Sequence, residues 1–339
     1  MKLATLRNGK PDGQLVVVTR DLTRFVSAGR FAPTLQAALD DWDAVAPKLQ
    51  ALSDELNAGG VASQPFEPAN ALAPLPRAYQ WIDGAGFLGH LERVRSLKGS
   101  KDEELQDDRP LLYQGGSDTL SAPTDPIRIP EENLATDFEA EVAVITGPVP
   151  MRATREEARA AIRLVTICND VSLRRLVLDD LKNGFGFFHA NPSTSFAPIV
   201  ATPDELGDIW RNNRLHARVR VMVNDTLYGQ PNAGIDMHFD FADLIVAATN
   251  TRALGAATIV GSGTIANRHE EVLPIKRDGI GFACIAEART VEKLQFGEVR
   301  TGFLNPGDSI NIAAFDSEGR TLFGEIQQKV ELATGAVSP

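Results

Sequence analysis

Three acidic residues alternate with apolar ones in ATDFEAEVAVITG, residues 135–147. Asp137, Glu139 and Glu141 take every second position, and alternate side chains of a β-strand point to the same face, so the three carboxylates are predicted to share one face. Like charges at this spacing repel unless they are solvated, protonated or bridged by a cation. Two interpretations are open at this point: a solvated outer face of an antiparallel sheet, or a divalent metal site.

A metal site would need ligands from other segments of the chain. Asp170 lies in TICNDVSLRRL, at the end of an apolar stretch that follows a predicted helix, where a rigid element can present a ligand. That helix begins at a capping box of Thr154 and Glu157 and is predicted to run toward Cys168. Because these candidate ligands offer carboxylate oxygens, they suit magnesium, calcium or manganese.

The composition argues against several classes of partner. The 339 residues include 34 basic and 45 acidic side chains, and the net charge of −11 disfavours nucleic acid and anionic membranes, so a small-molecule ligand is expected. The apolar stretches are too short for a membrane span and the first residues lack the apolar core of a signal peptide, so we expect a cytoplasmic protein. Cys168 and Cys284 lack CxxC spacing, which argues against a disulfide framework and a zinc cluster.

The turns and prolines predict two domains. Residues 1–72 contain two short strands around a Gly/Pro/Asp turn, then a helix pair whose apolar spacing is interrupted at Pro47 and stopped by a glycine pair. The proline-rich stretch 64–78 cannot continue a helix and is the predicted linker. We therefore expect a small N-terminal domain at residues 1–72, a β-hairpin plus the helix pair, and a larger domain at residues 73–335.

The larger domain is predicted to consist mainly of strands. Apolar and polar residues alternate from Leu215 to Val223 and end at an Asn224-Asp225 turn. The turn sequences NPGD and DSEG bracket another pair of strands near the C-terminus. Together with a few helices, these elements predict an α+β fold that is mainly β.

Several separated stretches between residues 80 and 330 resemble the motifs of the fumarylacetoacetate hydrolase family, in its bacterial two-domain type, and keep the family's order. They are WIDGAGFLGH, LLYQGGSD…PIRIP, DFEAEVAVI, NDVSLRR, GSGTIAN and GFACIAE. The resemblance implies a C-terminal mixed β-sandwich roll of the family's type beside the smaller N-terminal domain, and it implies a homodimer.

The resemblance also implies roles for individual residues. It implies a divalent metal, Mg²⁺ first with Mn²⁺ and Ca²⁺ as alternatives, held by four carboxylates: Asp83, Glu139, Glu141 and Asp170. It implies catalytic roles for His90, Glu287 and Arg174. It implies substrate contacts for Tyr113, Thr264 and Asn191.

The implied activity is metal-dependent hydrolysis of a carbon–carbon bond in a β-diketo acid, fumarylacetoacetate or a related acylpyruvate, in the catabolism of aromatic compounds such as tyrosine. The metal would polarise a diketone oxygen and stabilise the enolate that leaves. His90, oriented by Glu287, would take a proton from water. Arg174 would stabilise oxyanion or carboxylate charge, and Tyr113 would hold the distal carboxylate.

Three positions depart from the family's pattern. Asn191 stands where the family has a lysine, and Ala85 where the eukaryotic-type enzymes have a tyrosine. Because an asparagine brings no positive charge, two alternatives stay open: a decarboxylase, hydratase or isomerase on the same fold, or a metal-binding homologue without turnover. Asp137 matches no family ligand and is expected to be solvated or to lie behind the ligands.

Overall fold

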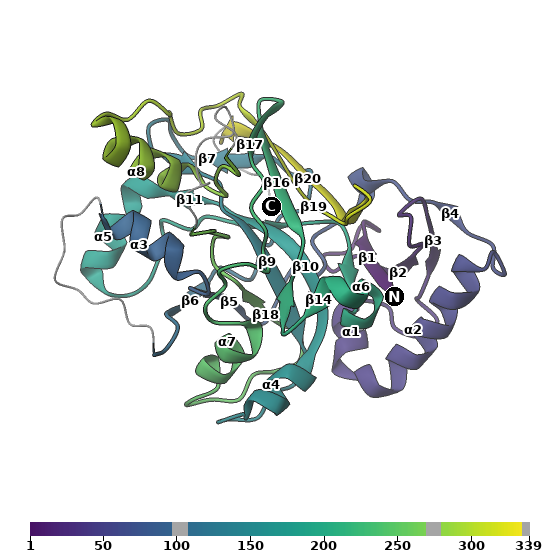
Figure 1. Cartoon of the computed structure of the whole chain (residues 1–339). Helices are drawn as coiled ribbons and strands as arrows, with labels where there is room; N and C mark the ends of the chain where they lie inside the picture. Colours follow the sequence, from purple (N-terminus) through teal and green to yellow (C-terminus); the bar gives the residue numbers. More distant parts are fainter. Residues whose placement is uncertain (97–107, 269–278, 334–339) are drawn as a thin grey trace.

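Two β-sheets dominate the computed structural model, which describes residues 1–96, 108–268 and 279–333. One sheet has 11 strands and the other 5. Helices lie at both ends and on the outer faces (Figure 1). The α+β fold class expected from the sequence is confirmed.

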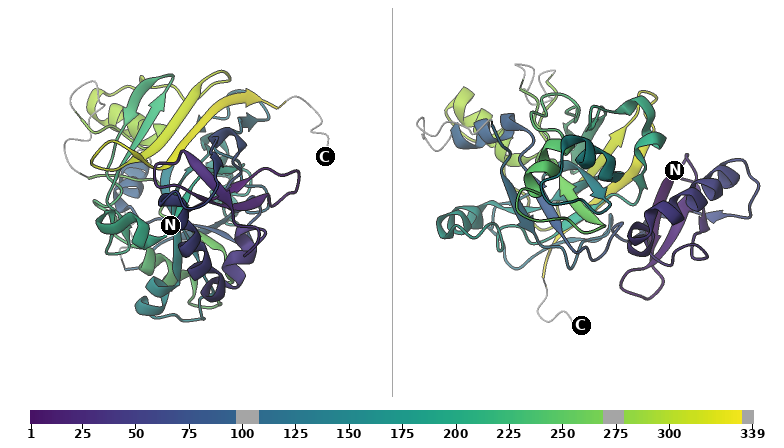
Figure 2. Two further views of the ribbon diagram at one scale, coloured as in Figure 1. Left: turned by 90° about the vertical axis from the view of Figure 1, so that its right-hand side faces the viewer. Right: turned by 90° about the horizontal axis from the view of Figure 1, so that it is seen from below.

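The N-terminal residues form the outer part of the larger sheet. β1 (Lys2–Leu6), β2 (Gln14–Val18), β3 (Arg24–Ser27) and β4 (Gln64–Pro65) follow one another as antiparallel neighbours. β1 also pairs with β13 (Val200–Ala201), so the sheet continues into the rest of the molecule. Figure 2 shows this N-terminal part on one side of the molecule.

The two N-terminal helices are separated at a different residue from the one predicted. α1 (Leu35–Asp40) ends at Asp41, whose backbone is not helical, whereas α2 (Trp42–Asn57) runs through Pro47. The proline lies on the exposed face of α2, where water can bind the backbone carbonyl that loses its partner. The domain boundary near residue 72 stays a proposal.

The centre of the larger sheet carries the strands that end at the candidate site, in the order β10-β9-β18-β5-β6. These strands are β10 (Ile162–Asp170), β9 (Ala140–Thr146), β18 (Thr258–Gly261), β5 (Trp81–Gly84) and β6 (Leu112–Gly115). β12 (Thr194–Phe196) also pairs with β10. β5 and β18 are parallel, and the other central pairs are antiparallel.

The helix predicted to run toward Cys168 is shorter than expected. Thr154 caps α4 (Arg155–Ala161) through the predicted capping box, but the chain then enters β10. The stretch IRLVTIC is rich in β-branched residues, which favour a strand. Asp170 therefore ends a central strand of the sheet.

The second sheet has the order β17-β16-β19-β20-β7. Its strands are β17 (Thr226–Gly229), β16 (Arg218–Val223), β19 (Ser309–Phe315), β20 (Thr321–Leu332) and β7 (Ile127–Ile129). The predicted turn before β17 is confirmed, with positive φ angles at Asn224 (48°) and Asp225 (59°). The strand predicted from Leu215 to Val223 is interrupted, because β15 (Arg214–Leu215) pairs with β14 (Trp210–Arg211) instead.

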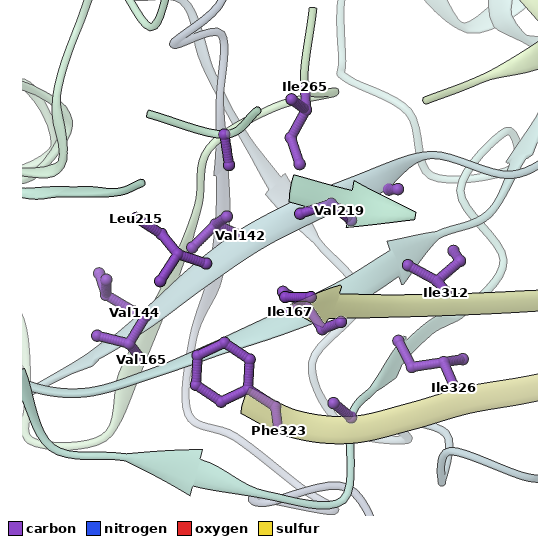
Figure 3. Close-up of a cluster of buried hydrophobic side chains, with 14 of the residues drawn as sticks. Val142, Val144, Val165, Ile167, Leu215, Val219, Ile265, Ile312, Phe323 and Ile326 are labelled. Carbon is purple, nitrogen blue, oxygen red and sulfur yellow. The ribbon is translucent and has the colours of Figure 1, made fainter. Parts of the chain in front are cut away.

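The main hydrophobic core lies between the two sheets. Figure 3 shows Val142 and Ile167 of the larger sheet in one cluster with Ile312, Phe323 and Ile326 of the second sheet. A separate cluster packs α1 and α2 against the N-terminal strands. These buried contacts hold the central strands rigidly, so the side chains at their ends have fixed positions.

Three helices lie at the end of the molecule opposite the N-terminal strands (Figures 1 and 2): α3 (Leu88–Ser96), α5 (Arg174–Asn183) and α8 (Ile285–Phe296). The remaining elements are short: β8 (Thr136–Asp137), β11 (Ser172–Leu173), α6 (Pro203–Leu206), α7 (Phe241–Ala248) and the 3₁₀ turns η1 (Pro68–Asn70) and η2 (Gly207–Ile209). Among the described residues, none of the helices has both the length and the apolar character that a membrane span needs.

Candidate active site

Three carboxylates from three strands of the larger sheet meet in the interior. Asp83 on β5, Glu141 on β9 and Asp170 on β10 are buried, and their carboxylate oxygens lie within 4.8 Å of one another. Gly261 on the intervening β18 leaves room for them, because a Cβ there would lie 2.5 Å from Oδ1 of Asp83 and 3.0 Å from Oε2 of Glu141. We call these three residues the acidic cluster; they are three of the four predicted metal ligands.

The fourth predicted ligand, Glu139, lies beside the acidic cluster. It precedes β9, its Oε1 accepts a hydrogen bond from Arg174, and the same oxygen is 3.8 Å from Nε2 of His90. The exposed fractions of Asp137, Glu139 and Glu141 are 0%, 6% and 0%. The interpretation of this stretch as a solvated sheet face is therefore wrong.

Asp137 lies behind the ligands, as one of the two expectations had it. Its carboxylate accepts hydrogen bonds from the backbone nitrogens of Ile285 (2.7 Å) and Ala286 (2.9 Å), at the start of α8, and from Nε of Arg174 (2.9 Å). Burial alone would lower the pKa of the Arg174 guanidinium, but the charges of Glu139 and Asp137 raise it well above its usual value. Asp137 thus fixes both α8 and Arg174.

The acidic cluster has the donor set of a divalent-metal centre. Burial and the charge of Asp170 raise the pKa of Asp83 well above the usual carboxyl range, and burial and the charges of Asp83 and Asp170 do the same to the pKa of Glu141. Neither side-chain oxygen of Glu141 accepts a hydrogen bond from a described residue. A divalent cation would supply the partner and the positive charge that these buried oxygens lack, so the residues fit Mg²⁺, Mn²⁺ or Ca²⁺.

Asp170 is held by three side-chain donors. The Tyr113 hydroxyl donates to Oδ2 at 2.6 Å, the Asn191 amide donates to Oδ1 at 3.0 Å, and the Thr194 hydroxyl also donates to Oδ1. Burial and the charge of Glu139 raise the pKa of Asp170, and the three donors oppose that rise. Tyr113 and Asn191, expected to contact substrate, therefore have their polar atoms on a candidate metal ligand.

His90 and Glu287 come together across α3 and α8. Nδ1 of His90 lies 2.7 Å from Oε1 of Glu287, and Arg93 donates to Oε2 of the same carboxylate at 2.6 Å. Burial alone would raise the pKa of Glu287, but the hydrogen bond with His90 and the charges of His90 and Arg93 lower it below its usual value. Glu287 is therefore ionised, and the His90 ring is oriented with Nε2 on the side of Glu139.

A cavity of about 270 Å³ lies beside these groups, and Glu141, Asp170 and Glu287 are not among the residues that line it. Its polar wall contains seven of the predicted site residues: Asp83, His90, Tyr113, Glu139, Arg174, Asn191 and Thr264. Ala85 also lines it. The apolar wall consists of Phe87, Leu91, Val94, Leu111, Leu112, Val177, Leu181 and Phe187. A small molecule bound in the cavity would therefore contact the histidine, carboxylates and apolar side chains.

Three residues of the site were not predicted from the sequence. Arg93 follows His90 by three positions, a spacing that puts both on one helix face and could have identified it. Thr194 lies on β12, whose pairing with the end of β10 depends on tertiary structure. Phe187 contacts the Tyr113 ring edge-on at 4.9 Å between centroids, and no local pattern indicates that contact.

Two family models together match almost the whole chain. The model described as fumarylacetoacetate (FAA) hydrolase C-terminal matches residues 80–331, and the model described as fumarylacetoacetase N-terminal domain 2 matches residues 1–77. The chain belongs to the fumarylacetoacetate hydrolase family. The fold of a family-type C-terminal part with a smaller N-terminal part, implied by the resemblance, is thereby confirmed.

Curated relatives in this family match only parts of the chain. The oxaloacetate tautomerase fahd2 of Xenopus laevis is 28% identical over 158 residues, which are 46% of this chain and 47% of the tautomerase. The oxaloacetate tautomerase YisK of Bacillus subtilis is 25% identical over 193 residues, 57% of this chain and 60% of that protein. The chain thus matches less than two thirds of the length of these relatives.

Solved structures of the family share the fold over nearly the entire chain. A putative HpcE protein from Mycobacterium smegmatis has a TM-score of 0.68 at 20% identity, covering 98% of this chain and 100% of that one. A maleylpyruvate hydrolase from Sphingobium sp. SYK-6, in complex with manganese (II) ion and pyruvate, has a TM-score of 0.65 at 18% identity with the same coverage. At these identities the likeness concerns the fold.

Proposed function

We propose that this protein is a metal-dependent hydrolase that cleaves a carbon–carbon bond of a β-diketo acid, fumarylacetoacetate or a related acylpyruvate. The observation that supports it most is the position of His90, which is hydrogen-bonded to the buried Glu287 and lines the same cavity as Asp83 and Glu139. A hydrolase needs a base for water next to a group that stabilises an enolate. The hydrolase bound to manganese and pyruvate, a product of acylpyruvate cleavage, lends further support.

The proposed metal ligands are Asp83, Glu141 and Asp170, with Glu139 as the fourth. Mg²⁺ is our first choice, and Mn²⁺ and Ca²⁺ are the alternatives. A divalent ion bound here would polarise the diketone and stabilise negative charge on the leaving enolate. The donors on Asp170 keep that carboxylate in one orientation before any metal arrives.

The side chains of this protein would move one proton and hold the substrate. His90 donates from Nδ1 to Glu287, which leaves Nε2 to accept a proton from water as its oxygen attacks the acyl carbonyl carbon. Arg174, charged and at the cavity wall, donates hydrogen bonds to a substrate oxyanion or carboxylate. We assign substrate contacts to Thr264 and, through their remaining cavity surface, to Tyr113 and Asn191.

A second candidate function is a decarboxylase, hydratase or isomerase, the last including a tautomerase. Asn191 favours it, because its amide nitrogen donates to Asp170 and to the carbonyl of Val171 and presents no cation to the cavity. The two oxaloacetate tautomerases among the relatives agree with this candidate. The third candidate, which Asn191 also favours, is a metal-binding homologue without turnover. As the family resemblance implies, we further propose a homodimer that acts in the breakdown of aromatic compounds, tyrosine included. We also propose the cytoplasmic location that the sequence led us to expect.

The test is an assay of the metal-free protein with and without Mg²⁺ or Mn²⁺, against fumarylacetoacetate, a panel of acylpyruvates and oxaloacetate. The hydrolase requires His90, so His90→Gln should lose cleavage by roughly 10²- to 10⁴-fold while still binding Mn²⁺. Glu141→Gln should lose both the cleavage activity and the binding of Mn²⁺. Metal-dependent enol–keto conversion or carbon dioxide release that persists in His90→Gln would select the second candidate. Mn²⁺ binding without any product would select the third.

A further inference from the structure

Arg93 connects helix α3 to two other segments of the chain. Its Nη1 donates to Oε2 of Glu287 at 2.6 Å, and its Nη2 donates to the backbone carbonyl of Asn267. The Arg93 and Glu287 side chains are 15% and 1% exposed, so water screens this ion pair little. Asn267 is itself fixed, because its side-chain amide donates to the carbonyls of Asn232 (3.1 Å) and Ile235 (3.0 Å).

The Glu287 carboxylate therefore contacts two residues on the same face of α3. His90 and Arg93 lie at positions i and i+3 of α3, and each contacts a different oxygen of Glu287. A rotation of the Glu287 carboxylate would break one of the two contacts. The positive charge of Arg93 favours the ionised carboxylate, which can only accept the hydrogen bond from His90.

Without the charge of Arg93, the His90 ring could adopt its other tautomer. If Glu287 were a neutral acid, as burial favours, it would donate its proton to Nδ1, and the ring proton would then lie on Nε2. The charge of Glu139, whose Oε1 lies 3.8 Å from Nε2 and is too far away for a hydrogen bond, would favour that tautomer. An Nε2 that carries a proton cannot take one from water. The charges that face the dyad are thus Arg93 beside Glu287, and Glu139 with its partner Arg174 beside Nε2.

We infer that Arg93 is a positioning residue that keeps Glu287 ionised and in one orientation, so that the His90 proton stays on Nδ1 and Nε2 stays an acceptor facing the cavity. The catalytic consequence rests on the proposed hydrolase function. The tautomer itself can be measured in the protein without turnover, so the two claims can fail separately.

The first experiment records the ring nitrogens of the five histidines by NMR in protein labelled with ¹⁵N-histidine, with the His90 signals assigned by their loss in His90→Gln. In the wild type, Nδ1 of His90 should have the shift of a protonated nitrogen and Nε2 that of an unprotonated one. In Arg93→Met the pattern should reverse or become a mixture, and Arg93→Lys should restore much of it. The matched control is Glu92→Gln, which removes the exposed ion pair between α3 and Arg268 and should leave the pattern unchanged.

The second experiment compares kinetics on whichever acylpyruvate is cleaved. We expect kcat to fall roughly 10- to 100-fold in Arg93→Met, with KM changed less than about threefold. Arg93→Lys should recover part of the loss, and Glu92→Gln should behave as wild type. If Arg93→Met does not fold, Arg93→Gln, which keeps a hydrogen-bond donor without the charge, replaces it. A folded Arg93→Met or Arg93→Gln with the wild-type tautomer pattern overturns the inference, whereas absence of cleavage by the wild type overturns only the proposed function.

Discussion

The hydroxyl of Tyr113 donates its hydrogen bond to Oδ2 of Asp170, 2.6 Å away. The family resemblance led us to expect this tyrosine to hold the far carboxylate of a substrate. Its one polar side-chain atom instead contacts a candidate metal ligand, while its ring lines the cavity and packs edge-on against Phe187. The tyrosine is thus placed to orient Asp170 for a metal.

Tyr113→Phe is therefore predicted to weaken Mn²⁺ binding by roughly 10-fold, because it removes a hydrogen bond that orients a ligand and keeps the ring contact with Phe187. Calorimetric titration of the metal-free variant measures this directly. KM for a cleaved acylpyruvate, measured at saturating Mn²⁺, should change little. An unchanged Mn²⁺ affinity with a raised KM would instead show that the Tyr113 hydroxyl binds substrate and does not orient Asp170.

Gly261→Ala is predicted to lower Mn²⁺ affinity by at least roughly 100-fold. A Cβ at this position would lie 2.5 Å from Oδ1 of Asp83 and 2.4 Å from Cη2 of Trp81, so the carboxylate and the indole must both move. Gly255→Ala is the matched control, since that position has open space around it. Metal titration and thermal unfolding of both variants test the prediction. Wild-type affinity in Gly261→Ala would show that the metal binds elsewhere.

Glu141→Gln is predicted to stabilise the metal-free protein at neutral pH. Burial and the charges of Asp83 and Asp170 raise the pKa of Glu141, so the folded state keeps a proton that the unfolded chain has lost above about pH 4.3. The free energy of unfolding therefore falls as pH rises from there through the raised pKa. Because glutamine does not ionise, the free energy of unfolding of the variant does not fall in this way. The variant should be more stable than wild type at pH 8 by about 1–3 kcal/mol, with a smaller difference near pH 4.

Urea unfolding in EDTA at both pH values measures these differences. Glu292→Gln is the opposite-sign control. Burial alone would raise the pKa of Glu292, but hydrogen bonds from Thr301 and Arg300 lower it, so its stabilising contribution is present above the ordinary pKa and is lost on acidification. Glu292→Gln should therefore be less stable than wild type at pH 8. A Glu141→Gln protein less stable than wild type at pH 8 would contradict the unpaired state of this carboxylate.

Asp137→Ala is predicted to lower the free energy of unfolding by about 3–5 kcal/mol. The change leaves Arg174 without one of its two buried partners and removes the acceptor for two backbone donors at the start of α8. Asp179→Ala, which removes an exposed ion pair with Lys182 on α5, should cost less than about 1 kcal/mol. Urea unfolding of both variants compares them, and equal losses would mean that Asp137 does not hold α8.

The sequence was most informative where the pattern is local. The capping box at Thr154, the turn at Asn224-Asp225 and the alternation of acids from Asp137 to Glu141 each depend on neighbouring residues, and the first two are confirmed. The lengths of elements were harder to predict. α4 ends early because the β-branched residues that follow favour a strand, and because β10 pairs with β9 on one edge and with β12 and β13 on the other. The β-branched residues are a local signal, but the pairings cannot be predicted from this stretch alone.

The site was predictable as a set of residues but not as a set of contacts. Spacing and resemblance identified Asp83, Glu141 and Asp170, which three strands bring within reach of one another. They did not indicate that Glu139 turns toward Arg174, because the chain leaves regular pairing between β8 and β9. Nor could they indicate the donors on Asp170, which come from β6, from β12 and from the loop before it.

The most direct test of the central claim is a single turnover of an acylpyruvate in H₂¹⁸O with Mn²⁺ present. Our account predicts cleavage into pyruvate and a carboxylic acid, with one solvent oxygen in the new carboxyl group, and cleavage that is slower by roughly 10²- to 10⁴-fold in His90→Gln. Substrate that stays uncleaved while its enol and keto forms interconvert, in wild type and His90→Gln alike, would contradict it.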